Sequence, residues 1–267
     1  MIALILSAAL GQWSPQPPGM LQFDPGAQCQ RTGGRCLKNR TSNRPNLFVS
    51  LADAPQAGDL SGAWWAMYGD GTMRSGSAVT LVPTGSPTNT VENGWPVRTY
   101  TSAQNDQEPA NVAFPASDFS VCYQRRQATT AGGDIMAFGT SSGVPGTFSA
   151  VPFELGGTMF AFVSDGATFV PTINGGTLTA NVWAVWCFTF QRVGSGTSVG
   201  TLYKDGAQVA QSTAMRLPQA LASVWSTNGA AAAASAPATT SATRGVFVTY
   251  KLLSAADIAR ITAATAP

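Results

Sequence analysis

Few side chains in this sequence could do chemistry, and one of the most versatile is missing. The chain has no histidine, which removes Ser-His-Asp and Cys-His catalytic arrangements and histidine-ligated metal sites. Its glutamates are Glu92, Glu108 and Glu154, and no strand-like run carries acids at i, i+2 and i+4, as glycoside hydrolysis on a strand face would require. No Gly-x-Ser-x-Gly motif or phosphate loop stands in a suitable context. The sequence therefore predicts a protein that is not an enzyme and that uses no cofactor and no metal.

Four cysteines are the remaining reactive groups. Cys29 and Cys36 flank Thr32-Gly33-Gly34, and because Gly-Gly readily forms a tight turn, we expect a small loop closed by a disulfide. Cys122 and Cys187 lie within the strand-like runs FSVCYQ and AVWCFTFQR, where a free cysteine is usually a small buried hydrophobic residue. The second run alternates, so we expect one face to carry Val185, Cys187, Thr189 and Gln191 and the other to carry Trp186, Phe188 and Phe190. No C-x-x-C pair occurs, so a structural zinc site is not expected. An even number of widely spaced cysteines suits an oxidising location.

Basic residues gather around the first cysteine pair. Five of the fifteen lysines and arginines stand within fourteen positions with no acid between them, and they are Arg31, Arg35, Lys38, Arg40 and Arg44. We interpret them as an arm that binds an acidic protein surface, with a solvated surface loop as the alternative. Nucleic acid is a weaker candidate partner, because no aromatic residues are interleaved and the net charge of the chain is only +2.

Residues 1–54 differ in composition from the rest of the chain. The opening MIALILSAALG is too short to span a bilayer and lacks the positive n-region of a signal peptide. We expect it to dock against the same chain or a neighbouring one, and an uncleaved export signal is the alternative. QWSPQPPG is typical of extended, polyproline-like chain. The sequence predicts an anchoring arm over residues 1–54, which contacts other protein subunits of an assembly, and a globular domain over residues 55–267.

From about residue 55 onward, short strands alternate with turn signals. Residues 226–243 are of low complexity, and Gly229 and Pro237 predict a long loop there rather than a helix. The run TSVGTLYKDGAQVAQ is the clearest hairpin. The expected hairpin turns share an Asn-Gly or Asp-Gly dipeptide, and they are Asn93-Gly94, Asp165-Gly166, Asn174-Gly175 and Asp205-Gly206.

One helix is expected at the end of the chain. In LLSAADIARI, Ser254 and Asp257 form a capping box, and Leu253 and Ile258 form the hydrophobic staple that accompanies it. Many short strands followed by one terminal helix predict an all-β fold of the sandwich type.

Several of these runs together resemble the laminin G-like and pentraxin-like jelly roll. They are FSVCYQRR, WCFTF with a glycine-rich turn and TLYKDGAQVA after it, and TYKLLSAADIARI. GAWWAMYGDGT and NDQEPANVAFPASDF are similar to the opening strand of that family and to the approach to its core, so the resemblance covers residues 55–264. It implies a two-sheet antiparallel jelly-roll sandwich with one short C-terminal helix, preceded here by the extended N-terminal arm. In pentraxins the two corresponding strands are bridged, so the resemblance implies a Cys122–Cys187 disulfide.

Pentraxins also bind calcium through acidic and amide side chains in two loops. The corresponding segments here, SSGVPGTFSA and TNGAAAAASAPATTSAT, contain no carboxylate, so we expect that calcium site to be absent. Elsewhere in the chain, Asp106 and Glu108 in QNDQEP are the candidate calcium ligands, and a solvated turn is the favoured alternative.

Two classes of function remain. The first is a non-enzymatic structural or adhesion module displayed on a larger particle and anchored by residues 1–54, because laminin G-like domains occur as decoration, fibre or adhesion proteins on phage particles and bacterial surfaces. The second is a secreted lectin-like protein that binds carbohydrate. Either function places the chain outside the cell or on a virion surface. Sugar sites combine exposed aromatic residues with amides, and the candidate aromatic residues, most of them expected in the core, are Trp64, Trp65, Trp95, Trp183, Trp186 and Trp225.

Overall fold

The fold is seen in a computed structural model of the chain, which divides into two compact units, Met1–Thr41 and Ser42–Pro267. Within the described part of the chain, no helix is long and apolar enough to cross a membrane. The predicted boundary between residues 54 and 55 lies outside the described residues and stays a prediction. The structure describes residues 30–32, 35–37, 64–69, 71, 73–75, 81–101, 104–107, 112–113, 118–130, 133–134, 136–139, 148–150, 153–155, 157–161, 173–194, 198–215, 222–227 and 240–265.

The first unit contains a short hairpin. Strand β1 (Gln30–Thr32) pairs antiparallel with β2 (Arg35–Leu37), with Thr32 opposite Arg35. Gly33 and Gly34, where the tight turn is predicted, lie outside the described residues, so that turn stays a prediction. Cys29 lies outside the described residues, and the Cys29–Cys36 disulfide stays a prediction.

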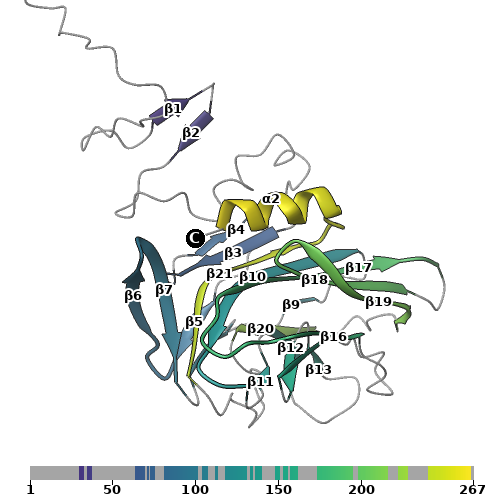
Figure 1. Ribbon diagram of the computed structural model, residues 1–267, viewed down its shortest axis with the longest axis horizontal. Helices are drawn as coiled ribbons and strands as arrows, with labels where there is room; N and C mark the ends of the chain where they lie inside the picture. Colours follow the sequence, from purple (N-terminus) through teal and green to yellow (C-terminus); the bar gives the residue numbers. More distant parts are fainter. Residues whose placement is uncertain are drawn as a thin grey trace, which may run out of the picture. The chain divides into compact units, whose positions relative to one another are not determined.

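Nine strands among the described residues of the second unit form one antiparallel sheet (Figure 1). Its order is β19-β18-β17-β10-β21-β3-β4, with β7 also paired to β21 and β6 paired to β7. In its centre, β10 pairs with β17 on one side and with β21 on the other. The strands are β3 (Trp64–Tyr68), β4 (Met73–Ser75), β6 (Thr88–Glu92), β7 (Trp95–Tyr100), β10 (Phe119–Gln127), β17 (Ala184–Arg192), β18 (Ser198–Lys204), β19 (Ala207–Met215) and β21 (Ser241–Thr249).

The remaining described strands form two smaller antiparallel sheets. The first has the order β13-β12-β20-β8-β5, with β9 paired to β20, and the second has the order β11-β14-β15-β16. Strands β16 and β19, which belong to different sheets, are in contact. The strands are β5 (Val82–Thr84), β8 (Asn105–Gln107), β9 (Val112–Ala113), β11 (Gly133–Asp134), β12 (Met136–Gly139), β13 (Phe148–Ala150), β14 (Phe153–Leu155), β15 (Thr158–Ala161), β16 (Ile173–Thr177) and β20 (Ala222–Thr227).

The two faces of β17 enter two different hydrophobic clusters. Trp186, Phe188 and Phe190 belong to the main core, which also includes residues of β15 and β16. Val185 and Cys187 point the other way and pack with Ile258 of helix α2 (Ala255–Thr265), which covers this outer face of the nine-stranded sheet (Figure 1). The period-2 alternation predicted for AVWCFTFQR is therefore confirmed. Most of strand β17 is buried on both sides, because helix α2 covers the second face.

The start of α2 has the predicted cap. The Ser254 hydroxyl accepts a hydrogen bond from the Asp257 backbone N–H, and the Asp257 carboxylate accepts one from the Ser254 backbone N–H. Burial raises the pKa of Asp257, but hydrogen bonds from Ser254 and Arg260 outweigh it, so the net pKa lies below the ordinary 3.8. Leu253 and Ile258 are both buried in the outer cluster, as expected for the staple.

Two of the four predicted hairpin turns are confirmed. Asn93-Gly94 joins β6 to β7 and Asp205-Gly206 joins β18 to β19, each with positive φ at both residues. Asp165-Gly166 lies outside the described residues. The prediction for Asn174-Gly175 was wrong, because both residues belong to β16.

Close packing explains the glycines in β16. A Cβ atom on Gly175 would lie 2.4 Å from the Cβ of Ala210, and one on Gly176 would lie 2.7 Å from the indole of Trp186. A glycine inside a strand often marks such a close approach.

The all-β sandwich with one C-terminal helix is confirmed by these elements. The loop predicted over residues 226–243 was too long at both ends. Thr227 still belongs to β20 and β21 begins at Ser241, while residues 228–239 lie outside the described residues.

Candidate functional site

A groove of about 530 Å³, lined by both polar and apolar side chains, opens on the side of the nine-stranded sheet that α2 covers. Its floor comes from the centre of the sheet, and its walls come from two hairpin turns, from residues 181–183 and from Thr262 of α2. Pockets of this size are typical of small-molecule sites. The side chains that matter for its chemistry are Asn93, Gln124, Asn181, Trp183, Asp205 and Arg244.

Three of these polar residues stand at turns with unusual backbone. Asn93, Asn181 and Asp205 have φ of 52°, 60° and 50°, and Ser86 is the fourth described non-glycine residue with positive φ. Asparagine and aspartate tolerate this left-handed conformation better than other side chains. The turns are held by hydrogen bonds. The Asn181 backbone N–H donates to the Gln127 carbonyl at 2.7 Å, and the Val185 backbone N–H donates to Asp205 Oδ1 at 2.8 Å.

A β-bulge shapes the floor. Along β10 and β21, Gln124 pairs with Gly245 and Arg125 pairs with Thr243, so Arg244 is the extra residue. Bulges re-aim side chains next to functional sites. Here the bulge brings Arg244 onto the same face as Gln124, and both side chains line the groove although they are only 4% and 3% exposed.

Trp183 lies between charged groups at the edge of the floor. The Arg244 guanidinium carbon is 4.2 Å from the centre of its ring and that of Arg126 is 5.1 Å away, both within cation–π range. Arg244 is also 5.5 Å from the ring of Trp95, and Arg126 pairs with Glu92 at 2.7 Å. These contacts fix the indole of Trp183, which is half-buried.

The groove can bind a polar ligand, but its described lining does not form a hydrolytic site. Asp205 is the one carboxylate among the described lining residues, and the chain has no histidine. Acid–base hydrolysis of a glycoside needs a pair of carboxylates. Amides, one carboxylate, one guanidinium and an indole are suited to hydrogen bonding and stacking instead.

The structure places the tryptophan candidates differently from one another. Trp95 and Trp186 are buried, at 3% and 1% exposure, whereas Trp183 alone among those with described side chains lines the groove. The side chains of Trp64, Trp65 and Trp225 lie outside the described residues.

The disulfide implied by the resemblance is present between Cys122 and Cys187. The two residues face each other across β10 and β17 with their Cα atoms 4.1 Å apart, and both are fully buried. Their position beneath α2 makes them structural groups rather than part of the groove. Of the basic arm residues, Arg31 and Arg35 lie in β1 and β2, and Lys38, Arg40 and Arg44 lie outside the described residues.

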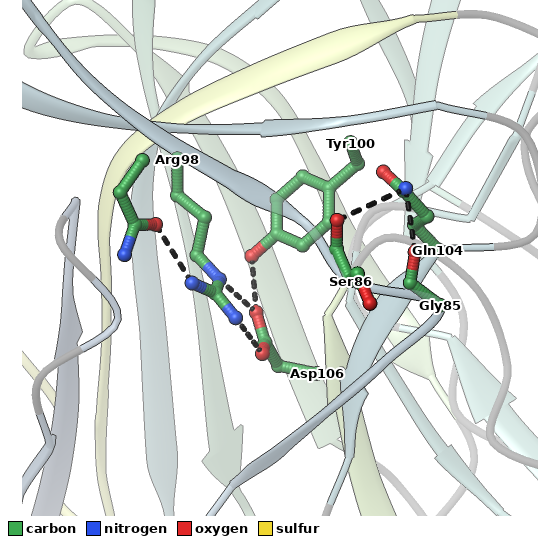
Figure 2. Close-up of polar contacts among 7 residues, drawn as sticks. Gly85, Ser86, Arg98, Tyr100, Gln104 and Asp106 are labelled. Carbon is green, nitrogen blue, oxygen red and sulfur yellow. Dashed lines mark hydrogen bonds and ion pairs between the residues drawn. The ribbon is translucent and has the colours of Figure 1, made fainter.

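Asp106 is neither a calcium ligand nor part of a solvated turn, so both interpretations of this residue were wrong. Figure 2 shows the Asp106 carboxylate accepting two hydrogen bonds from Arg98 and one from the Tyr100 hydroxyl. Each of the three distances is 2.6 Å, and the Asp106 side chain is only 2% exposed. Arg98 donates a further hydrogen bond to Asn89. Burial lowers the pKa of Arg98, but the hydrogen bonds and charge of Asp106 outweigh this and raise it above its ordinary value. Glu108 lies outside the described residues.

The Arg98–Asp106 pair joins the two layers of the sandwich, because Arg98 belongs to β7 of the nine-stranded sheet and Asp106 to β8 of the six-stranded one. Nearby, Gln104 donates hydrogen bonds to the carbonyls of Gly85 and Ser86 (Figure 2). Within the described residues, no group of three or more acidic, histidine or cysteine side chains could hold a metal ion. The pentraxin calcium loops lie largely outside the described residues, and their loss of calcium stays a prediction.

The chain is similar to known proteins in its fold but not in its sequence. No protein family and no curated protein sequence matches the chain. Among solved structures, it is similar to the receptor-binding domain of botulinum neurotoxin type G, with a TM-score of 0.51, 8% identity and coverage of 76% of this chain and 51% of that one. It is also similar to a structure of botulinum neurotoxin type C, whose cell entry depends upon interaction with two ganglioside molecules. There the TM-score is 0.56 and the identity 10%, with 78% of this chain and 52% of that one covered. For the binding domain of botulinum neurotoxin DC in complex with rat synaptotagmin II, the TM-score is 0.56 and the identity 13%, with 77% of this chain and 52% of that one covered.

The chain spans about half the length of these solved chains. At such low identity the similarity establishes the β-sandwich fold alone. The resemblance of the sequence to a jelly roll is supported at that level, and its assignment to the laminin G-like or pentraxin-like families stays a prediction.

Proposed function

We propose that this chain is a non-enzymatic adhesion module that binds glycans through its β-sandwich and joins a larger assembly through residues 1–54. The observation that carries the glycan-binding part is the groove. It places the half-buried Trp183 in one groove with three amide side chains, one carboxylate and one guanidinium, which come from the sheet and from three turns. Sugar sites combine an aromatic surface with a few fixed polar groups.

The solved relatives support a recognition role in general terms. One depends upon ganglioside molecules for cell entry and another binds a protein, synaptotagmin II. Since this chain aligns with about half of each, their ligands are not transferred to it. What they support is that this type of β-sandwich occurs in receptor-binding proteins, which agrees with a binding module rather than a catalyst.

The anchoring part rests on the sequence and on the division of the chain. Residues 1–41 form a unit of their own, and this region contains the apolar MIALILSAAL and four of the five basic arm residues. An apolar segment and a basic one in the same region can provide hydrophobic burial for affinity and charge for orientation. We propose that the assembly is a phage particle, as a decoration or fibre protein, or a cell surface. The Cys122–Cys187 disulfide supports an extracellular or virion-surface location.

A glycan array with the full-length protein tests the recognition part. We expect binding to a restricted set of glycans, at levels that do not change when calcium is chelated. An array without any specific signal would contradict the proposal. Hydrolysis of a bound glycan, detected as release of reducing ends, would show that the chain is an enzyme.

Fractionation tests the anchoring part. In the host that carries the protein, the full chain should sediment with particles or envelopes, and a chain without residues 1–54 should stay in the supernatant while its circular dichroism remains that of a β-sandwich. If the shortened chain sediments as the full one does, the arm is not the anchor.

A further inference from the structure

We infer that the groove beside α2 binds an uncharged saccharide unit, with the turn residues Asn93, Asn181 and Asp205 as the groups that bind its hydroxyls. This inference rests on the proposed function and deepens it, because it assigns the site and the chemical class of the sugar. The three residues stand on three separate turns, yet they line one groove.

The charges of the groove favour an uncharged ligand. Its described lining has one cation, Arg244, on the floor and one anion, Asp205, at the rim. A carboxylate on a sugar would be attracted by the first and repelled by the second, and burying an imperfectly paired charge is costly. A neutral hydroxyl instead accepts from a guanidinium or an amide and donates to a carboxylate or an amide oxygen. Both charges then contribute to binding.

The turn residues are held in place before a ligand arrives. The hydrogen bond from the Val185 backbone fixes the Asp205 carboxylate through Oδ1, and a carboxylate has about four acceptor sites, so capacity for a sugar hydroxyl remains. The Asn181 side-chain amide donates to the Ala128 carbonyl at 3.4 Å while its backbone donates to Gln127. Groups that are already ordered lose little entropy when they bind a ligand.

Apolar surface beside the amides suits the C–H face of a sugar ring. Val182 is 52% exposed in a groove wall, and Trp183 next to it is half-buried. Arg244 and Arg126 both contact the Trp183 ring, and these contacts restrict its rotation. An aromatic ring held in this way provides contact area at low entropic cost.

A saccharide fits this site better than a peptide does. Peptides usually bind along a sheet edge, in a long apolar groove or on an aromatic-lined proline groove. This groove lies over the centre of the sheet, on β10, β17 and β21, and its polar groups come from turn tips around one compact space.

Affinity gel electrophoresis of the full-length protein tests the inference. The probes are neutral polysaccharides (mannan, galactomannan and a soluble β-glucan), acidic ones (alginate and polygalacturonate) and gelatin as a polypeptide. We expect at least one neutral gel to retard the protein. The variant Asn93→Gly/Asn181→Gly keeps the positive φ and removes both amides, and it should weaken that retardation about tenfold or more, as the loss of two hydrogen bonds predicts. Asp205→Asn keeps an acceptor for Val185 and should weaken it less.

Ser86→Gly is the matched control, because Ser86 has a φ of 58° but is not among the lining residues of the groove. It should leave retardation unchanged, and all variants should unfold at the wild-type temperature within a few degrees. If neutral gels retard the turn variants as strongly as they retard the wild type, the groove is not the binding site, while the proposed function stands. Binding only to acidic gels, or to gelatin, would overturn the assigned chemistry. No retardation in any gel, with an array lacking signal, would overturn the proposed function itself.

Discussion

Loss of the Cys122–Cys187 bond should be one of the most damaging single changes to this fold. The bond joins neighbouring central strands whose residues pair directly, and it spans 65 residues of sequence. In the chain-entropy description, a bridge stabilises the native state because it removes freedom from the unfolded chain. For a loop of this length the expected contribution is about 4 kcal/mol.

The change to make is Cys122→Ala/Cys187→Ala in a background that carries Cys29→Ser/Cys36→Ser, so that no other disulfide contributes. Both sulfurs are fully buried beside Val185, Phe247 and the helix, so alanine also leaves small cavities. A Cys122→Val/Cys187→Val variant refills that space and isolates the effect of the bridge. We expect the valine variant to lose about 4 kcal/mol and the alanine variant somewhat more.

Urea unfolding followed by tryptophan fluorescence measures this loss. Dithiothreitol should destabilise the background protein by a similar amount and should leave both double variants unchanged. A loss under about 1 kcal/mol in the valine variant and on reduction would refute the reasoning, because it would mean that the unfolded chain already keeps these strands together. Free thiols at both positions in non-reduced peptide mapping would show that the bond does not form.

Three further outcomes are expected. In urea unfolding, Asp106→Asn should lower the free energy of unfolding by about 3 kcal/mol or more, because the buried guanidinium of Arg98 loses its counter-charge. Glu92→Gln removes a partly exposed ion pair with Arg126 and should lower it by less than about 1 kcal/mol. In scanning calorimetry, Asp257→Asn should lower the melting temperature slightly at pH 7. Because the pKa of Asp257 in the folded protein lies below the ordinary 3.8, the difference between variant and wild type should shrink as the pH falls below 3.8 and vanish in stronger acid. Gly200→Ala should cost about 1–3 kcal/mol, because a Cβ there overlaps the buried sulfur of Met215, and unchanged stability would contradict that packing.

Local signals predicted the fold well. The turns at Asn93-Gly94 and Asp205-Gly206, the alternation of β17 and the capping box of α2 each depend on a few consecutive residues, so they are readable without the rest of the chain. The same dipeptide signal failed at Asn174-Gly175, where contact with Ala210 of another strand decided the role of the glycine. Tertiary packing had overridden a local preference.

The groove was beyond prediction because its residues come from distant positions. The two turn asparagines, Asn93 and Asn181, are almost ninety residues apart, and the sequence around Asn181 has no Asn-Gly or Asp-Gly dipeptide to mark a turn. One signal was present but unused: a glycine inside the strand-like RGVFVTY is typical of a bulge, and the bulge brings Arg244 into the groove. Asp106 was misread because an acid in QNDQEP gives no sign of a buried arginine on another strand.

The strand at one end of the nine-stranded sheet bears on how copies of this chain can meet. Strand β19 has an extra residue relative to β18 at two places, so its regular pairing is broken into short stretches, of which the longest runs from Ala210 to Ser212. An uncharged terminal strand of nine residues would otherwise offer a template for a neighbouring chain. The two irregularities interrupt that template, and the terminal strand β4 on the main path is only three residues long. Growth of the sheet by adding strand to strand is thus disfavoured at both of these ends.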